Sequence, residues 1–384
     1  MNTRRDLLLG TGGAMVGACA TWLTHRWPQP AAAQPKPASR LRLPPVRVSA
    51  DREIRTVVGL RPYRPDGFVV STEKFGAKTV VHNYGHGGGG VTLSWGTAEL
   101  AVRELAEAEP NPSGVAVLGA GVVGLSTAIL LLRKGIPVTV YAEKLPPDTT
   151  SNIAGAQWFP FSVCEPAALK GDFKKQFVEA TELSFLAFQA LVGSRRYPVR
   201  WMTNYYIDEV KQKPRNLDPL LEPGSIISKM VMNRTILRAG EHPFPSMKHD
   251  IFSYDTMMID PAPYLDALVE DVRGLGGKFV IRKFADQTAV LRLPEYALVN
   301  CTGLGAGTLF PDKQLVAKKG QLTVLFPQHE IDYAVDGDEF YMFPRRDGIL
   351  LGGTTEKDVW GVEPNLAAKK KVLAAHRDRF AGME

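Results

Sequence analysis

Three glycines between Gly119 and Gly124 have the GxGxxG spacing that suits the phosphates of a dinucleotide. Gly119 permits a tight turn, Gly121 lets the backbone approach a pyrophosphate, and Gly124 lets a helix pack closely on a strand. If a helix begins here, its unpaired N–H groups and its positive dipole end face the phosphates. Three further residues of the turn are expected to contact the cofactor: Ala120, Val122 and Val123.

The residues around this turn have the pattern of a strand, a helix and a second strand. Val115–Leu118 is a short apolar run of the kind found in buried parallel strands, and Leu125–Arg133 has a helical pattern. Val138–Tyr141 predicts the second strand, and Glu143, 24 residues after the first glycine, can accept hydrogen bonds from ribose hydroxyls. This context favours a dinucleotide site over a purely structural glycine turn, without choosing between FAD and NAD.

The rest of the chain predicts a two-domain α/β protein without internal repeats. Its 384 residues, 45% apolar and 22% charged, have an ordinary globular composition. Helices are predicted over three further segments, namely Phe173–Val192, Pro261–Gly274 and Asn365–Phe380. Strands are predicted over Lys278–Ile281, Tyr296–Cys301, Gln321–Phe326, Glu339–Phe343 and Ile349–Leu351.

Charge and cysteine content argue against several classes of function. The formal net charge is +6, but much of the excess lies in the first 47 residues, so the rest of the chain is closer to neutral. Lys and Arg form no run with interleaved aromatic residues, so no nucleic-acid partner is expected. No Cys/His spacing matches a zinc site, so no metal is expected. Cys301 is predicted to be a buried thiol, with a disulfide to Cys164 left as an alternative.

The N-terminus has the features of an export signal. Arg4-Arg5 precedes a Gly/Ala-rich apolar run that is too short for a stable membrane span, and Ala31–Ala33 offers small residues for cleavage. Residues 1–33 are therefore predicted to be a twin-arginine signal peptide that directs the protein to the periplasm, and residues 34–45 a Pro-rich linker. Lipidation at Cys19, giving a membrane anchor, and an unprocessed tail remain as alternatives.

Four groups of residues together resemble the D-amino acid oxidase family. They are the glycine turn followed by Thr149–Trp158, then Val299–Gly303, then Tyr341–Pro344 with Leu351–Gly353, and finally Gly59–Pro65 with Val81–Gly88 and Ser94–Gly96. The fourth group is the most specific, because agreement over its three parts is hard to reach by chance. The resemblance covers about residues 46–384 and implies a Rossmann-like FAD-binding domain with a mixed-sheet substrate domain.

The order of these groups differs from that of the family. The fourth group lies near the C-terminus in the family, whereas here it precedes the glycine turn. The simplest account is a circular permutation in which Glu107–Gly114, a short polar and Pro-rich segment, joins the original ends. A fragment fused to an unrelated protein is the alternative. The FAD-binding parts are then expected at about 76–165, 285–310 and 348–384, and the substrate-domain parts at about 166–284 and 311–347.

The resemblance implies oxidation of D-amino acids, in which a hydride passes from the substrate Cα to flavin N5 and the imine hydrolyses to a 2-oxo acid and ammonia. Arg61 matches the family arginine that binds the substrate carboxylate, Tyr341 matches a tyrosine that binds the same group, and Gly88 matches a glycine whose carbonyl accepts from the amine. His82 and His86 are expected to pack and hydrogen-bond rather than catalyse. Beyond the glycine turn and Glu143, FAD contacts are expected from Thr149, Thr150, Ser151, Gly155, Ala156, Gln157, Thr302, Gly303, Gly87, Gly88, Gly90 and Thr92.

Two positions depart from the family pattern. Gly89 replaces a bulky residue, which is expected to loosen its turn and enlarge the site. Gly337 replaces a lid tyrosine of mammalian members and lies in the acidic stretch 327–340, which is expected to disfavour D-aspartate and to favour neutral or basic side chains. Two other functions remain open: a flavin amine dehydrogenase that passes electrons to a quinone or carrier, and a non-catalytic flavin or amino-acid binding protein. Oxygen and another electron acceptor are both open, and no pattern indicates an oligomeric state.

Overall fold

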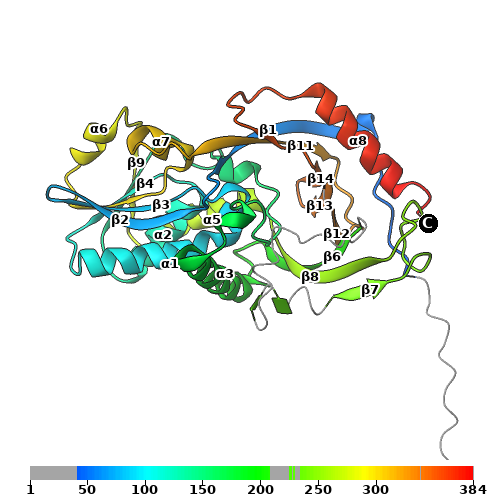
Figure 1. The fold of residues 1–384 in the computed structure, drawn as a ribbon, viewed down its shortest axis with the longest axis horizontal. Helices are drawn as coiled ribbons and strands as arrows, with labels where there is room; N and C mark the ends of the chain where they lie inside the picture. Colours follow the sequence, from blue (N-terminus) through cyan, green and yellow to red (C-terminus); the bar gives the residue numbers. More distant parts are fainter. Residues whose placement is uncertain (1–40, 208–224, 227, 230–233, 338, 384) are drawn as a thin grey trace, which may run out of the picture. The chain divides into compact units, whose positions relative to one another are not determined.

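The computed structural model describes residues 41–207, 225–226, 228–229, 234–337 and 339–383. The predicted signal peptide, Cys19 and most of the predicted linker lie outside these residues. From Leu41 onward the chain forms one unit that contains two β-sheets (Figure 1).

The first sheet has six strands in the order β2-β3-β10-β4-β5-β9. All neighbours are parallel except β2 and β3, which form an antiparallel hairpin. The strands are β2 (Val69–Phe75), β3 (Lys78–Tyr84), β4 (Val115–Leu118), β5 (Val138–Ala142), β9 (Lys278–Ile281) and β10 (Ala297–Asn300). All residues of β4 and β10 are buried, as expected where a parallel sheet is covered on both faces.

Helices pack on this sheet from both sides, with α1 and α2 along one side and α6 and α7 along the other (Figure 1). The longer helices are α1 (Gly90–Ala108), α2 (Val122–Arg133), α3 (Gly171–Leu191) and α5 (Pro261–Gly274). A Cβ at Gly96 would lie 1.9 Å from the Ala180 carbonyl oxygen, so glycine is what allows α1 and α3 to cross so closely. Trp95 Nε1 donates a hydrogen bond of 2.7 Å to the Tyr264 hydroxyl and thereby ties α1 to α5.

The second sheet has nine strands, eight of them in the order β1-β11-β14-β13-β12-β6-β8-β7, with β15 paired to β11. The strands are β1 (Glu53–Tyr63), β6 (Val199–Tyr206), β7 (Thr235–Leu237), β8 (Ile251–Ile259), β11 (Val316–Leu325), β12 (Tyr333–Asp336), β13 (Tyr341–Arg345), β14 (Gly348–Gly352) and β15 (Glu356–Lys357). Apart from β12 and β6, which are parallel, the neighbours are antiparallel.

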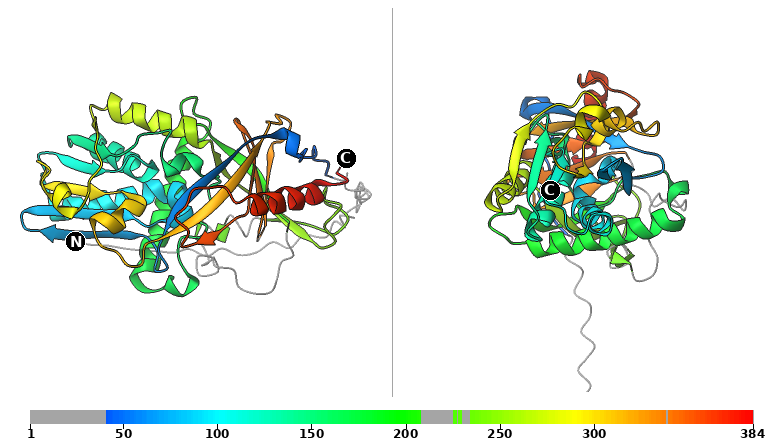
Figure 2. Two further views of the ribbon diagram at one scale, coloured as in Figure 1. Left: turned by 90° about the horizontal axis from the view of Figure 1, so that it is seen from above. Right: turned by 90° about the vertical axis from the view of Figure 1, so that its left-hand side faces the viewer.

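Alternation along the central strands gives this sheet two different buried faces. Met342 and Leu351 point toward the helix α8 (Leu366–Phe380), which lies beside β1 and β11 in Figure 2. Phe343 and Leu350 point to the opposite face, where they pack with Ile153. Because successive side chains of a strand point to opposite sides, the second face is free to form the wall of a site while α8 supports the first.

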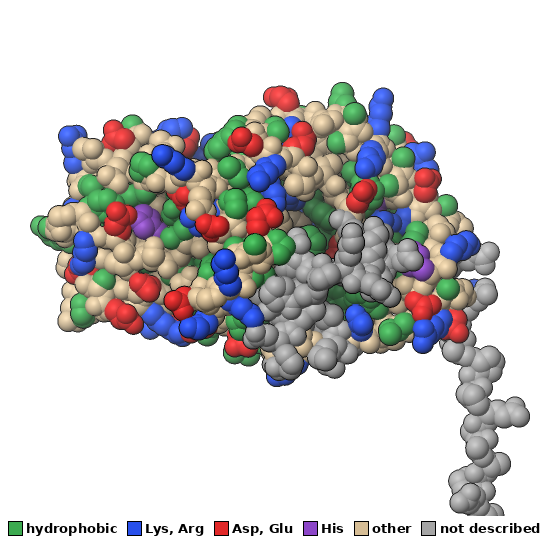
Figure 3. Space-filling view, in the orientation of Figure 1, with side chains coloured by type: hydrophobic (Ala, Val, Ile, Leu, Met, Phe, Trp, Pro, Cys, Tyr) green, Lys and Arg blue, Asp and Glu red, His purple; other side chains and the backbone are tan. Residues whose placement is uncertain are grey.

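Short helices complete the fold. They are α6 (Gln287–Leu291), α7 (Ala306–Leu309) and the 3₁₀ helices η1 (Ala50–Arg52), η2 (Gly87–Gly89), η3 (Thr150–Ile153), η4 (Pro166–Ala168) and η6 (Gly303–Gly305). On the face shown in Figure 3, basic and acidic side chains are interspersed. Among the described residues, no helix combines the length and apolar character needed to cross a bilayer.

The predicted strand–turn–helix–strand around Gly119 is confirmed, as are the three helices predicted elsewhere, within a few residues of their expected ends. The membership of the two sheets differs from the predicted division of the chain at β9 and β14, and β2 precedes the first predicted part. β2 and β9 belong to the six-stranded sheet, although β2 precedes 76 and β9 lies within 166–284. β14 belongs to the nine-stranded sheet, although it lies within 348–384, because its pairing with β11 and β13 buries all five of its residues.

The alternative disulfide is wrong, because Cys164 and Cys301 are both free and buried. Burial raises the pKa of the Cys301 thiol to about 12 and that of the Cys164 thiol to about 11. Both groups are therefore protonated and unreactive near neutral pH.

Candidate active site

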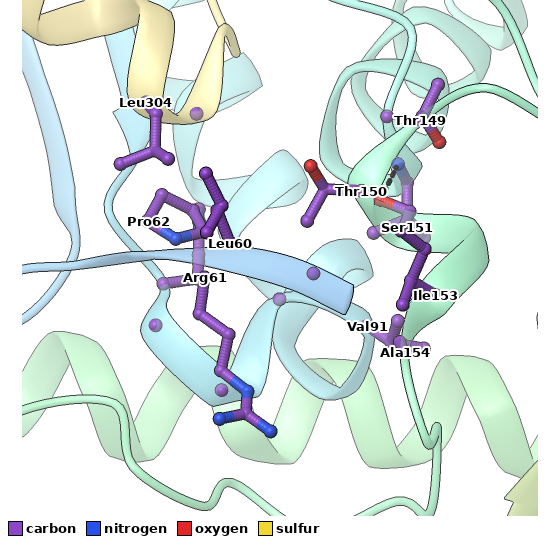
Figure 4. Close-up of a pocket in the computed structure, with 18 of the residues that line it drawn as sticks. Leu60, Arg61, Pro62, Val91, Thr149, Thr150, Ser151, Ile153, Ala154 and Leu304 are labelled. Carbon is purple, nitrogen blue, oxygen red and sulfur yellow. Dashed lines mark hydrogen bonds between the residues drawn. The ribbon is translucent and has the colours of Figure 1, made fainter. Parts of the chain in front are cut away.

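A cavity of about 1040 Å³ brings together residues from both sheets. It extends from Glu143 and Arg282, past the glycine turn at Gly119, to Arg61 and Tyr341. Every predicted cofactor or substrate residue lines this cavity except Gly124. Figure 4 shows the side chain of Arg61 extending from β1, with η3 on the far side of the pocket.

The glycine turn has the geometry that its sequence predicted. Gly119 adopts φ +100°, a conformation that favours glycine, and a Cβ there would lie 2.5 Å from the Cys301 carbonyl oxygen. Gly124 lies behind the cavity wall, where a Cβ would be 2.0 Å from the Gly119 carbonyl oxygen. The third glycine therefore allows α2 to begin directly against the turn, and Val122 and Val123 at the start of α2 line the cavity.

The segment after β5 forms the wall of the cavity that lies opposite the glycine turn at Gly119. Ser151 Oγ accepts a hydrogen bond of 3.0 Å from the Val122 N–H at the start of α2, which holds η3 against the glycine turn. Glu143 follows β5 and forms a 2.9 Å ion pair with Lys283, both side chains being largely exposed. A carboxylate and an ammonium thus lie together at the end where a ribose would bind.

A second glycine turn, Gly87–Gly90, leads into α1 and also lines the cavity. A Cβ at Gly87 would lie 2.3 Å from the Ser162 carbonyl oxygen, and the same oxygen accepts a 3.0 Å hydrogen bond from Gly88 N–H. The expectation that Gly89 enlarges the site is wrong. Gly89 does not line the cavity, and a Cβ there would be 2.6 Å from Val163 Cγ2. Val163 fills the space that a larger residue at position 89 would need, so the turn is tight rather than loose.

Arg61 and Tyr341 approach one another across the nine-stranded sheet. Arg61 lies on β1 and its guanidinium lies over Gly320 of β11, where a Cβ would be 2.7 Å from Arg61 Cζ. Tyr341 lies on β13 opposite Gly352 of β14, where a Cβ would be 2.1 Å from Tyr341 Cζ. The two glycines lie on the inner strands, so each outer side chain can lie flat over its neighbour and reach the middle of the sheet.

The electrostatics of this pair suit an anionic ligand. Burial raises the pKa of Tyr341, while the charge and hydrogen bond of Arg61 lower it and the charge of Asp336 raises it. The net shift is upward, so the phenol remains a hydrogen-bond donor beside a permanently charged guanidinium. The planar guanidinium of Arg61 and the hydroxyl of Tyr341 lie in one cavity, and such a pair is well suited to binding a carboxylate.

Both histidines of the fourth group, His82 and His86, are buried beside hydrogen-bonding partners. His86 is buried, stacks on Phe68, and its Nε2 lies 3.0 Å from Thr97 Oγ1. Burial lowers the pKa of His86 to about 3, which makes it a poor base. His82 is also buried, with Nδ1 3.2 Å from the amide nitrogen of Asn300.

Sequence reasoning missed several residues near the site. Phe343 and Leu322 line the cavity beside Tyr341, and strand periodicity places them on the same face. Lys318 pairs with Arg61 across β1 and β11, and its Nζ lies 3.5 Å from the Tyr63 ring centre and 3.2 Å from Ser162 Oγ. No local pattern marked Lys318, because its place beside Arg61 follows from the pairing of β1 with β11.

A glycine turn of the dinucleotide-binding type and the Arg61–Tyr341 pair thus share one cavity of this fold. The family model described as FAD dependent oxidoreductase (DAO) matches residues 3–104 and 114–384. The chain therefore belongs to the DAO family of FAD-dependent oxidoreductases and its cofactor is FAD. The glycine turn at Gly119–Gly124, with its close backbone approaches, fits that group.

Individual proteins support the same assignment. A D-amino-acid oxidase of Streptomyces coelicolor is 30% identical over 277 residues, which cover 70% of this chain and 79% of that protein. A D-amino-acid oxidase of Dictyostelium discoideum is 27% identical over 263 residues, which cover 67% of this chain and 70% of that protein. The structure of glycine oxidase from Bacillus cereus has a TM-score of 0.52 at 13% identity, covering 69% of this chain and 77% of that one, and so shares the fold.

Proposed function

We propose that this protein catalyses the FAD-dependent oxidative deamination of D-amino acids to 2-oxo acids and ammonia. The observation that carries this proposal is the meeting of Arg61 and Tyr341 over Gly320 and Gly352, inside the cavity that holds the glycine turn. The relatives named as D-amino-acid oxidases support the choice of D-amino acids over other anionic substrates.

Each residue of the pair has a separate part in holding the substrate. The Arg61 guanidinium binds the carboxylate through two parallel hydrogen bonds, and the Tyr341 hydroxyl donates a third. Together they fix the carboxylate and so orient the Cα hydrogen, which provides much of the catalytic advantage in a reaction between bound partners. When bound, FAD supplies the acceptor for the hydride that leaves Cα.

The glycine turn at Gly87–Gly90 completes the arrangement at the amine end. The Gly88 carbonyl accepts a hydrogen bond from the substrate amine, and its position is set by the bond from Gly88 N–H to Ser162. Lacking a side chain, Gly88 lets the backbone lie against both ligand and cofactor. Water then hydrolyses the released imine, and hydrogen peroxide forms as well if oxygen is the electron acceptor.

Product analysis tests this proposal. Purified protein loaded with FAD is incubated with single D-amino acids, and 2-oxo acid and ammonia are measured together, first with oxygen and then with a quinone or dye acceptor. Equal amounts of both products from D-amino acids support the proposal, and the faster acceptor distinguishes an oxidase from a dehydrogenase. Formation of neither product with any D-amino acid and any acceptor would rule it out.

We also infer that the chain is a circular permutation of the family order. The family match is interrupted at residues 105–113, within or beside the predicted joining segment Glu107–Gly114. The alignments with individual relatives span 261 to 277 residues, which is close to the length of the second matched segment alone. Leu43 and Val46 pack in the same apolar cluster as Phe380 and Met383, so the two ends that the family order would join lie together.

A reordered chain tests the permutation. In this chain, residues 114–384 come first and are followed, through a short Gly/Ser linker, by residues 43–108. The expected result is a protein that binds FAD and unfolds at nearly the same temperature as the original. An insoluble chain, or one without FAD affinity, would count against the permutation, provided that the original order prepared in parallel folds.

Export through the twin-arginine route is a further proposal, which rests on Arg4-Arg5 and the apolar run after it. This route carries folded proteins, which suits an enzyme that loads FAD in the cytoplasm. Fractionation of cells that express the full chain should place it in the periplasm, and Arg4→Lys with Arg5→Lys should retain it in the cytoplasm. Labelling with a fatty acid, abolished by Cys19→Ser, would identify a lipid anchor.

A further inference from the structure

Two strands support β11 on the side away from β1, and a short stretch of β11 lies between them. β14 pairs with residues 323–325 of β11, and β15 pairs with residues 318–319. Residues 320–322 lie between these two sets of partners. Gly320 is the residue over which the Arg61 guanidinium lies, so this interruption falls beside the proposed carboxylate site.

The side chain of Thr354 supports β11 at this interruption. Thr354 Oγ1 accepts a hydrogen bond of 2.7 Å from the Gln321 N–H and donates one of 3.2 Å to the Gln321 carbonyl oxygen. The N–H and C=O of one strand residue point to the same side, where a neighbouring strand normally satisfies both. A hydroxyl is both a donor and an acceptor, so one threonine side chain can take the place of that strand.

A glycine brings Thr354 to this position. β14 ends at Gly352, and the next residue, Gly353, adopts φ +136°, a conformation that favours glycine. A Cβ at Gly353 would lie 2.4 Å from the Glu339 carbonyl oxygen. The chain thus leaves the regular path of β14 at Gly353, and the side chain of the following residue, rather than its backbone, bonds to Gln321.

Gln321 is also held by its own side chain. It is buried, its Oε1 accepts a 2.6 Å hydrogen bond from the Asn365 N–H, and its Nε2 donates one of 3.2 Å to the Asn365 carbonyl oxygen. Asn365 in turn caps α8 by accepting from the Ala368 N–H. Loss of the Thr354 hydroxyl would leave this attachment to α8 intact, so the expected result is a local shift of β11 and not unfolding.

The Thr354 hydroxyl joins the supports of the two proposed substrate-binding side chains. Thr354 follows two residues after Gly352, the glycine beside Tyr341, and its partner Gln321 is the neighbour of Gly320, the glycine under Arg61. Thr354 also lines the cavity, but its hydroxyl hydrogen is used in the bond to Gln321. The hydroxyl is therefore placed to hold a strand and not to donate to a ligand.

We propose, on the basis of the proposed function, that Thr354 is a positioning residue for the substrate carboxylate. Its hydroxyl holds Gln321 in place, and through the adjacent Gly320 it sets the position of the Arg61 guanidinium. Thr354 acts without touching the reacting atoms, and its effect on the reaction depends on Arg61.

Two substitutions separate the hydroxyl of Thr354 from the shape of its side chain. Thr354→Val keeps the branched shape without the hydroxyl, whereas Thr354→Ser keeps the hydroxyl. Anaerobic reduction of the FAD-loaded enzyme by a D-amino acid is followed by flavin absorbance. The valine variant should be slower by about tenfold, because a misplacement near 1 Å can cost up to about 100-fold, and the serine variant should react nearly as the wild type does. Thr203→Val, which removes a 2.8 Å hydrogen bond to Asp255 outside the cavity, is the matched control.

A double-mutant cycle with Arg61→Lys tests whether Thr354 acts through Arg61. In the wild-type background Thr354→Val should slow flavin reduction about tenfold, whereas in the Arg61→Lys background it should slow reduction by less than about twofold. The reason is that the guanidinium whose position Thr354 sets is absent from the lysine variant. A general structural role of Thr354 would give the same ratio of rates in both backgrounds.

The outcomes separate this inference from the proposed function. If the valine variant reacts as fast as the wild type, if serine does not restore the rate, or if the loss is equal in both backgrounds, the inference is wrong and the proposed function stands. If no D-amino acid reduces the flavin of the unmodified enzyme, the proposed function fails and this inference fails with it. Should Thr354→Val not bind FAD, Thr354→Cys, whose thiol is a weaker donor and acceptor, takes its place in the same cycle.

Discussion

The guanidinium of Arg61 lies directly over Gly320 of the neighbouring strand, where an added Cβ would come within 2.7 Å of Arg61 Cζ. The same relationship holds between Tyr341 and Gly352 two strands away. Each of the two side chains that we propose bind the substrate therefore depends on a glycine beside it. Glycine weakens a strand, but its missing side chain leaves the space in which the neighbouring side chain lies.

Gly320→Ala should displace the Arg61 guanidinium and lower kcat/KM by about 10- to 100-fold, since a shift near 1 Å can cost about that much. The colliding atoms belong to the end of a flexible side chain, so the fold and the FAD content should be preserved. Steady-state kinetics together with the visible flavin spectrum check this prediction. Gly361→Ala is the control, because a Cβ there meets nothing within 4 Å; equal rates for the two variants would contradict the account.

Arg61→Lys should be a severe change despite conserving the charge, because an ammonium cannot form the two parallel hydrogen bonds of the guanidinium. A loss of about 1.5–3 kcal/mol, the range for hydrogen bonds to charged groups, lowers kcat/KM by roughly 10- to 150-fold. FAD affinity, measured by fluorescence titration, should remain unchanged. A lysine variant with full activity would show that the carboxylate is bound elsewhere.

Gly124→Ala should weaken FAD binding although Gly124 does not line the cavity. A Cβ would lie 2.0 Å from the Gly119 carbonyl oxygen, so the turn and the start of α2 must move apart. Overpacking of this kind costs about 1–3 kcal/mol, and the FAD dissociation constant should rise by roughly 5- to 150-fold. Gly114→Ala, whose Cβ would make an ordinary 3.7 Å contact with Pro137, should leave the titration as it is in the wild type.

Stability should fall in mild acid because of His86. Burial lowers the pKa of His86 to about 3, below the usual value of 6.5, so the unfolded state takes up a proton first as pH falls. The part of the unfolding free energy that depends on a neutral His86 is fully present above about pH 6.5. It is lost as the pH falls toward 3, at about 1.4 kcal/mol per pH unit. Between pH 7 and pH 5 the wild type should therefore lose about 2 kcal/mol more unfolding free energy than His86→Gln.

Urea unfolding at both pH values measures this difference. His329→Gln replaces an exposed histidine and serves as the control, which should behave as the wild type does. If His86→Gln shows the same loss as the wild type, proton uptake at His86 is not the cause.

Local patterns predicted the part of the site that is built from consecutive residues. The turn from Gly119 to Gly124 fixes its own geometry, and the short apolar strands on either side are buried on both faces. α1 was not predicted, because its first half, up to Ala98, is almost wholly buried and has no polar stripe. β1 was missed for the opposite reason, since most of its residues are partly exposed and do not alternate.

Features that depend on pairing between distant segments could not be predicted from local patterns. The resemblance identified Arg61 and Tyr341, but the glycines under them follow only from the strand order β1-β11-β14-β13. The expectation for Gly89 was wrong because Val163, 74 residues later in the chain, fills the space beside it. Likewise, only the fold shows that Asp336 and Glu339 of the acidic stretch line the cavity, whereas Glu330 and Asp332 do not.

Anaerobic mixing of the FAD-loaded protein with D-amino acids, and separately with their L-enantiomers, tests whether this protein oxidises D-amino acids. The visible absorbance of the flavin should disappear with D-enantiomers and persist with L-enantiomers, and in the Arg61→Lys variant the loss should be much slower. A flavin that no D-amino acid bleaches, or that L-amino acids bleach equally well, would contradict the assignment of this protein as a D-amino acid oxidoreductase.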